Sequence, residues 1–104
     1  MTTLRIIIVN WNSGTQTRDC LRAIATQAKK ECFRLESVVV VDNASGDGSA
    51  DGLEAEFASF ATTMPLHVLR NADNRGFAAA CNQGASGATA DYILLLNPDT
   101  LTYP

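Results

Sequence analysis

The sequence predicts an α/β fold with a Rossmann-like, doubly wound and mainly parallel sheet. Four apolar runs are separated by longer segments with helical spacing, and the β-α-β unit repeats about every 30 residues. The runs are apolar at nearly every position, as strands must be when helices cover both faces of a parallel sheet. The expected strands are Leu4–Val9, Val38–Val41, Leu66–Leu69 and Tyr92–Leu96.

Three helices are expected between these strands, because apolar residues recur at spacings of three and four. The expected helices cover residues 17–28, 49–64 and 76–88. Ser13 or Thr15 can cap the first. The third is rich in alanine, which suits close packing on a sheet. Its GASG segment (84–87) lies inside the helical pattern, so these glycines indicate packing or helix termination.

Composition limits the class of protein. The 104 residues form one domain with 46% apolar residues, and 8 Lys+Arg against 11 Asp+Glu give a net charge of −3. Without a basic cluster we expect no nucleic-acid partner. No apolar run approaches the roughly 20 residues of a membrane span, and the N-terminus lacks a signal-peptide pattern. The three widely spaced cysteines predict reduced, buried thiols. We therefore expect a cytoplasmic protein, or one at the inner face of the membrane in full-length form.

The fourth expected strand has no internal Pro or Lys and is followed by only a short tail. Such an apolar strand belongs inside a sheet, with a neighbour on each side. Residues 1–104 are therefore expected to form the first half of a longer domain. Standing alone, the chain is expected to form a homodimer through the open edge of this strand.

Polar side chains follow all four expected strands. In an open α/β sheet, ligands bind beyond the carboxyl ends of the strands, where the strand order reverses. Hydrogen-bonding groups at these ends predict a nucleotide site. The candidate residues for nucleotide binding are Asn10, Trp11, Asn12, Asp42, Asn43, Arg75 and Asn97.

Asp42 and Arg75 together match the edge of a pyrimidine base. Uracil and thymine present an N3–H donor between two carbonyl acceptors, which a carboxylate and a guanidinium complement. The alternative for Asp42 is a cap on the turn that follows it. Trp11 either stacks on a base or covers the sheet edge. No G-x-G-x-x-G follows the first strand, which argues against a dinucleotide or methyl-donor binder.

Asp99 is the candidate metal ligand. It follows the fourth strand in LLLNPDT, where a carboxylate beside phosphate oxygens can hold Mg²⁺ or Mn²⁺. Such a cation would neutralise charge on a departing diphosphate. The alternative is an Asp in an ordinary Pro-Asp turn.

Four segments in this order resemble the nucleotide-sugar-binding N-terminal half of family 2 glycosyltransferases with a GT-A fold: IIIVNWNSG, VVVVDNASGDGS, NRGFAAACNQG and ILLLNPDT. The last two most resemble the rhamnosyltransferase-like branch. The resemblance implies base contacts from Asp42 and Arg75 and a metal on Asp99. Asn97 stands where many members have the first Asp of a D-x-D motif, which weakens the case for two carboxylates on the cation.

The resemblance also implies an activity. The expected donor is a UDP- or dTDP-sugar, with dTDP-rhamnose one candidate, and the acceptor is a saccharide or a lipid-linked molecule. The family's catalytic base, which supports inversion, lies in the second half, so this chain is expected to contain no catalytic residue and to transfer no sugar alone. The alternative is a non-catalytic nucleotide-binding or interaction module with the same type of fold.

Overall fold

The computed structural model describes residues 2–28 and 34–98, and it confirms the predicted α/β fold. Four strands form one parallel sheet: β1 (Thr3–Asn10), β2 (Arg34–Asp42), β3 (Leu66–Arg70) and β4 (Tyr92–Leu96). Their spatial order is β3-β2-β1-β4. The chain moves outward from β1 to β3 and then returns to the other side of β1. The strand order therefore reverses beside β1, where this class of sheet binds ligands.

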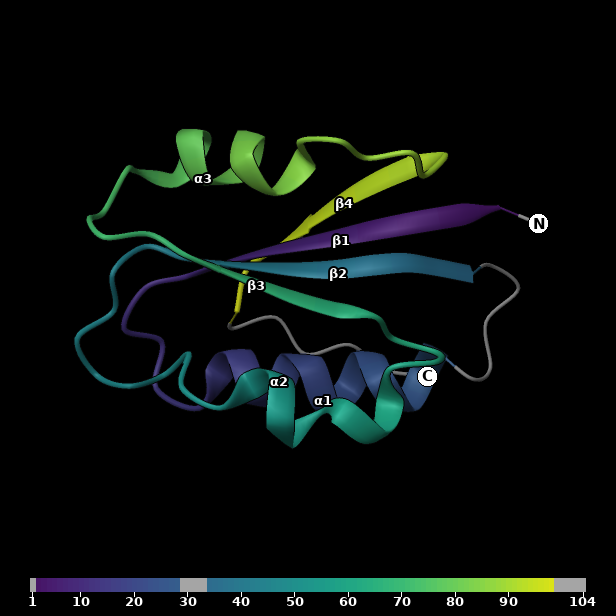
Figure 1. Cartoon of the computed structure of the whole chain (residues 1–104), viewed down its shortest axis with the longest axis horizontal. Coiled ribbons are helices and arrows are strands. Elements are labelled where there is room, and N and C mark those ends of the chain that lie inside the picture. Colours follow the sequence, from purple (N-terminus) through teal and green to yellow (C-terminus); the bar gives the residue numbers. More distant parts are fainter. Residues whose placement is uncertain (1, 29–33, 99–104) are drawn as a thin grey trace.

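Helices cover both faces of the sheet, as Figure 1 shows. The helices α1 (Gln16–Ala28) and α2 (Leu53–Glu56) lie on one face, and α3 (Phe77–Ala85) lies on the other. In β2, Val38 and Val40 belong to the cluster on the α1 face, whereas Val39 and Val41 pack with Ala80 on the α3 face. Burial on both faces explains why the strands are apolar without alternation.

The second predicted helix is wrong in its extent. The structure has only the four-residue α2 and a 3₁₀ turn, η1 (Ala58–Phe60), within residues 49–64. Phe57 leaves helical geometry at φ −105° and ψ 15° and separates the two. Leu53 and Phe57 are nonetheless buried, and Phe60 is partly buried against the same core cluster. A helical turn followed by a 3₁₀ turn thus delivers the same apolar residues to the core, so the pattern was satisfied by shorter elements.

The third helix is shorter than its pattern and lies very close to the sheet. It ends at Ala85 rather than residue 88, and Gly87 follows it at φ +72°. A Cβ on Gly84 would stand 2.7 Å from Ile7 Cγ2 and 3.2 Å from Val41 Cγ2. The structure thus confirms that the GASG segment serves packing and helix termination.

The amino-terminal end of the sheet is closed by an ion pair. Arg5 lies 2.8 Å from Glu36 and donates to the Gly84 carbonyl oxygen at 3.0 Å. The backbone N–H of Thr89 donates to the other Glu36 oxygen at 3.0 Å. Burial raises the pKa of Glu36, but hydrogen bonds from Ser37, Thr89 and Arg5 outweigh it and lower the pKa to about 2. This ionised pair ties the α3–β4 connection to β1 and β2.

Two further expectations concern membranes and thiols. Within the described ranges, no helix is long and apolar enough to cross a bilayer. Cys20 and Cys81 are buried free thiols, and burial raises the pKa of both. The third cysteine, Cys32, lies outside the described residues.

Gly84→Ala should lower the free energy of unfolding by about 1–3 kcal/mol, because the added methyl overpacks Ile7 and Val41 by more than helix propensity returns. Urea unfolding monitored by circular dichroism measures this. Gly46→Ala is the matched control, since a Cβ there meets nothing within 4 Å. Equal stability of the two variants would show that α3 can move off the sheet at little cost.

Candidate functional site

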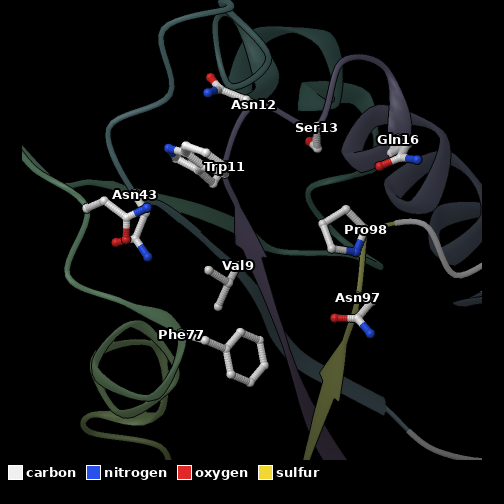
Figure 2. A pocket seen from close by; sticks show the side chains of 10 residues that line it. Val9, Trp11, Asn12, Ser13, Gln16, Asn43, Phe77, Asn97 and Pro98 are labelled. Atoms are coloured by element: carbon white, nitrogen blue, oxygen red, sulfur yellow. The ribbon is translucent and has the colours of Figure 1, made fainter.

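A pocket of about 490 Å³ opens at the carboxyl ends of β1, β2 and β4, where the strand order reverses (Figure 2). It is built from the ends of these strands, from the loops that follow them, and from the first residues of α1 and α3. The lining residues are Val9, Trp11, Asn12, Ser13, Gln16, Asn43, Asn74, Phe77, Asn97 and Pro98. Four of the sequence candidates are therefore brought together here: Trp11, Asn12, Asn43 and Asn97.

An apolar strip made of Trp11, Val9 and Phe77 runs through the pocket. Figure 2 shows Val9 between the two aromatic rings. Trp11 and Phe77 are each 56% exposed, although both are large apolar side chains. Such exposure in a concave site is typical of a surface that stacks on a flat ring.

Amide side chains flank this strip. Asn43 and Asn74 lie on the α3 side, and Asn12, Gln16 and Asn97 come from the loops after β1 and β4 and from α1. Among the residues described, the lining contains no ionisable side chain. Neutral donors and acceptors beside an apolar strip suit the edges and faces of a heterocycle.

Phe77 was missed as a site residue because its spacing from Ala80 and Cys81 placed it on the packing face of the helix. In the structure Phe77 is 56% exposed and lies outside the cluster that packs α3 on the sheet. As the first residue of α3, it lies beyond the carboxyl end of β1 and beside Val9 in the pocket. An aromatic side chain immediately after a glycine-ended loop was the signal available. Ser13, Gln16 and Asn74 were also missed, because each is ordinary in a turn or a helix start.

Asn10 was expected to face the nucleotide, but its side chain is buried and does not line the pocket. It is fully buried, and its Nδ2 lies 2.9 Å from Asp42 Oδ1. Its side-chain partners come from the end of β2, from the loops after β1 and β2 and from the start of α1; they are Asp42, Ser45, Ser49, Ser13 and Thr17. Both ends of the amide are used, so Asn10 holds the strand ends together rather than offering a group to a ligand.

Asp42 is 7% exposed and does not line the pocket. Its Oδ1 accepts the Ser45 hydroxyl at 2.5 Å as well as Asn10 Nδ2, and the Ser45 N–H lies 3.4 Å from Oδ2. Asp42 therefore caps the turn after β2, which confirms the structural alternative. A contact with a base stays a prediction.

The loops after β1 and β2 are fastened to each other. Asn12 accepts the Gly46 N–H at 2.8 Å and holds a left-handed φ of +47°, which asparagine tolerates. Asp47 accepts the backbone N–H groups of Gly14 and Ser49 at 3.1 and 2.9 Å. Bonds from the Ser49 hydroxyl and from these N–H groups lower the pKa of Asp47. The loop after β1, which lines the pocket through Asn12 and Ser13, is thus held by bonds from backbone N–H groups to side-chain oxygens.

Arg75 stands beside the pocket and not in its lining. Its side chain is 53% exposed and lies 3.5 Å from Asp73, a loose ion pair in water. The other charged candidate, Asp99, lies outside the described residues. Within the described parts of the chain, no three His, Cys, Asp or Glu side chains come together as a metal site.

Comparison with known proteins assigns the family. The model of glycosyl transferase family 2 matches residues 5–104. The chain belongs to this family. The family expected from the sequence motifs is thereby confirmed.

The relatives show how much of such a protein this chain represents. The uncharacterized glycosyltransferase YfnE of Bacillus subtilis is 33% identical over 92% of this chain and 23% of its own length. The uncharacterized glycosyltransferase YibD of Escherichia coli is 29% identical over 97% of this chain and 27% of its own length. The family 2 chain described here thus spans about a quarter of these relatives.

Solved structures confirm the fold. The mannosyltransferase PcManGT of Pyrobaculum calidifontis, in complex with GDP-Man and Mn²⁺, matches with a TM-score of 0.76 and 26% identity. The match covers 94% of this chain and 28% of PcManGT. S. aureus TarS 1–349 in complex with UDP matches with a TM-score of 0.68 and 22% identity, over 95% of this chain and 28% of TarS. The family 2 chain therefore has the expected GT-A type of sheet.

Asn10→Asp should lower the free energy of unfolding by about 2–4 kcal/mol at pH 7, because it places a second carboxylate against buried Asp42. The introduced carboxyl takes a raised pKa, so its protonated form is compatible with folding and the loss should shrink as the pH falls from 8 to 5. Urea unfolding across that range measures this. Asn12→Asp, at an exposed position that keeps its acceptor for Gly46, should show little change with pH.

Proposed function

We propose that this chain is the donor-binding half of an inverting glycosyltransferase that uses a UDP- or dTDP-sugar. The observation that carries the proposal is the pocket at the switch point of the sheet, with Trp11, Val9 and Phe77 as an apolar strip between neutral amides. A flat base can stack on the strip while amides bind its edge or the ribose hydroxyls. Asn97, at the end of β4, is the candidate for a ribose hydroxyl.

The charge of the diphosphate is the second argument. The described lining supplies neutral oxygen and nitrogen atoms and no cation, so two phosphates would enter this site uncompensated. Oxygen donors of this kind fit a hard Mg²⁺ or Mn²⁺ ion held largely by the nucleotide, and Asp99 follows the lining residue Pro98 by one position. Asp99 is thus the proposed ligand. The bound ion would offset charge on the leaving diphosphate.

The choice of base rests on side chains and not on the fold. PcManGT holds a guanine nucleotide sugar on the same type of sheet. In this chain the proposed readers are Asp42, for the pyrimidine N3–H, and Arg75, for a carbonyl oxygen. Neither residue lines the pocket in the structure, since Asp42 is buried and engaged in its turn and Arg75 forms a loose ion pair, so a rearrangement of these residues on binding is part of the proposal.

The finer assignments belong to the same proposal. The NRGFAAACNQG and NPD segments support a rhamnosyltransferase-like enzyme, with dTDP-rhamnose as a candidate donor and a saccharide or lipid-linked acceptor. The buried free thiols Cys20 and Cys81 fit a reducing compartment. We therefore place the full-length protein in the cytoplasm or at the inner face of the membrane, in polysaccharide synthesis.

Uridine diphosphate should bind this chain more tightly than guanosine diphosphate in the presence of Mn²⁺. Asp42→Asn should weaken the uridine nucleotide by about 1–3 kcal/mol, because an amide is a poorer acceptor for N3–H. Since Asp42 also caps its turn, the ratio of the two affinities is the informative quantity in calorimetry. A base-reading residue changes that ratio, whereas a purely structural one lowers both affinities together.

Two controls accompany this titration. Asp47→Asn makes the same charge change in the same loop and should leave the ratio unchanged. Repeating the titration in EDTA should abolish most of the binding if a divalent cation links Asp99 to the diphosphate. Equal binding in EDTA would contradict the metal assignment but not the nucleotide site.

We also propose that the 104-residue chain pairs with a second copy along β4. Among the residues that the structure describes, this strand is hydrogen-bonded to β1 on one side only, and it contains no charged residue or proline. Four of its five side chains are more than 40% exposed: Tyr92, Ile93, Leu94 and Leu95. Exposed edges are usually protected by charge or proline, and this one offers both backbone hydrogen bonds and apolar area to an identical edge.

Light scattering after size exclusion at micromolar concentration should give twice the 11.1 kDa mass of the chain. Leu94→Lys should shift the protein to the monomer, because two lysines would meet across the new strand pair. Ala78→Lys, on the exposed side of α3, is the control and should remain dimeric. A monodisperse wild-type monomer would show that β4 is not a self-pairing edge.

A further inference from the structure

One wall of the pocket is the segment 72–77, which joins β3 to α3. It contributes Asn74 and Phe77 to the lining and places Arg75 at the margin. These three residues are exposed, so burial of their own side chains does little to hold them in position. What fixes this wall must therefore come from elsewhere in the fold.

Three amide side chains beneath the segment form a continuous chain of hydrogen bonds, which we call the amide relay: Gln83, Asn71 and Asn43. Gln83 and Asn71 exchange two bonds, Nδ2 of Asn71 to Oε1 of Gln83 at 2.9 Å and Nε2 of Gln83 to Oδ1 of Asn71 at 2.8 Å. Asn71 Nδ2 also donates to Asn43 Oδ1 at 3.0 Å. The relay thus links the last turns of α3 to the end of β2.

The relay ends on the backbone of the pocket wall. Asn43 Nδ2 donates to the Gly76 carbonyl oxygen at 3.1 Å, and Asn43 Oδ1 lies 3.4 Å from the Arg75 N–H. Gly76 has a left-handed φ of +82°, and its carbonyl also accepts the Ala80 N–H. The residue immediately before Phe77 is therefore fixed from two directions.

The relay is hydrogen-bonded to the ends of the central strands β1 and β2. Asn43 and Asn71 are 2% and 8% exposed. The Asn43 N–H donates to the Asn10 carbonyl oxygen, and the Asn71 N–H donates to the Asp42 carbonyl oxygen, both at 2.9 Å. Next to Gln83, Gly84 packs directly on Ile7 and Val41. Buried and matched amide groups of this kind are costly to break, so their geometry is well determined.

We propose that Gln83 and Asn71 are positioning residues that act through Asn43 to hold segment 72–77 ready for a nucleoside diphosphate. The inference deepens the proposed nucleotide site and rests on it. Gln83 does not belong to the lining of this pocket, so its effect on a ligand passes through the relay. A side chain that served α3 stability alone would not alter the wall selectively.

The test uses Gln83→Leu, which keeps the size of the side chain and removes its amide. Trp11, the single tryptophan of the chain, lines the pocket, so its fluorescence reports uridine diphosphate binding in the presence of Mn²⁺. We expect the dissociation constant to rise about tenfold, the effect of one or two lost hydrogen bonds on the geometry of the wall. Asn82→Leu, an exposed amide on the same helix, should stay within about twofold of wild type.

Two further readouts separate positioning from stability. In a Phe77→Ala background the Gln83→Leu effect should largely disappear if the relay acts by placing that ring, whereas a general loss of stability would persist unchanged. Hydrogen exchange without nucleotide should show lost protection at the Arg75 and Ala80 amides in Gln83→Leu, with β1 and β2 unaffected. Gln83→Glu, which keeps an acceptor, is the milder variant should the first one fold poorly.

The outcomes are distinct. Failure of the wild-type chain to bind uridine diphosphate overturns the proposed function, and hydrogen exchange then decides whether the relay holds the wall. If wild type binds but Gln83→Leu binds equally well, or if exchange at Arg75 and Ala80 is unchanged, the relay has no positioning role. Selective loss in both measurements supports it.

Discussion

Parallel pairing of β1 with a strand on each side is the constraint on which the rest of this structure depends. Because β2 and β4 both run parallel to β1, the carboxyl ends of all three strands open at one edge. Every connection from a strand to the next helix must therefore cross this edge. The polar loops gather there because the topology leaves them no other place.

Gathering those loops buries polar groups, and amide and hydroxyl side chains supply the hydrogen bonds that these groups need. Asn10, Asp42 and Asn43 are almost fully buried at the strand ends, where unpaired polar groups would be strongly destabilising. Each is bonded to side chains or backbone of a neighbouring loop. Buried polar groups therefore form the foundation of the site, and exposed aromatic and amide groups form its surface. Site candidates at strand ends divide between these two roles.

The two ends of the sheet show different chemistry. The amino-terminal end is closed by the Arg5–Glu36 ion pair, whose carboxyl pKa of about 2 keeps it charged in ordinary conditions. The carboxyl end is lined, among the residues described, by neutral groups around a pocket of about 490 Å³. A pocket without its own charge is suited to a ligand that arrives with a counter-ion. The candidate site thus lies at one end of the sheet and the partly buried ion pair at the other.

The sequence alone determined the sheet, its parallel direction and the family. Continuous apolar strands and the four linked motifs are local features of the chain, so they can be recognised without knowing any tertiary contact. It also predicted a candidate site at the strand ends, where the pocket lies, since that place follows from the topology. Only the tertiary structure divided the candidates: burial and pairing turned Asn10 and Asp42 inward, while Trp11, Asn12, Asn43 and Asn97 came to line the pocket. Phe77 became a site residue because the start of α3 lies beside Val9, and residues 49–64 formed two short elements because several backbone paths bury the same side chains. Spacing records which residues are apolar, but only three-dimensional packing decides which of them meet.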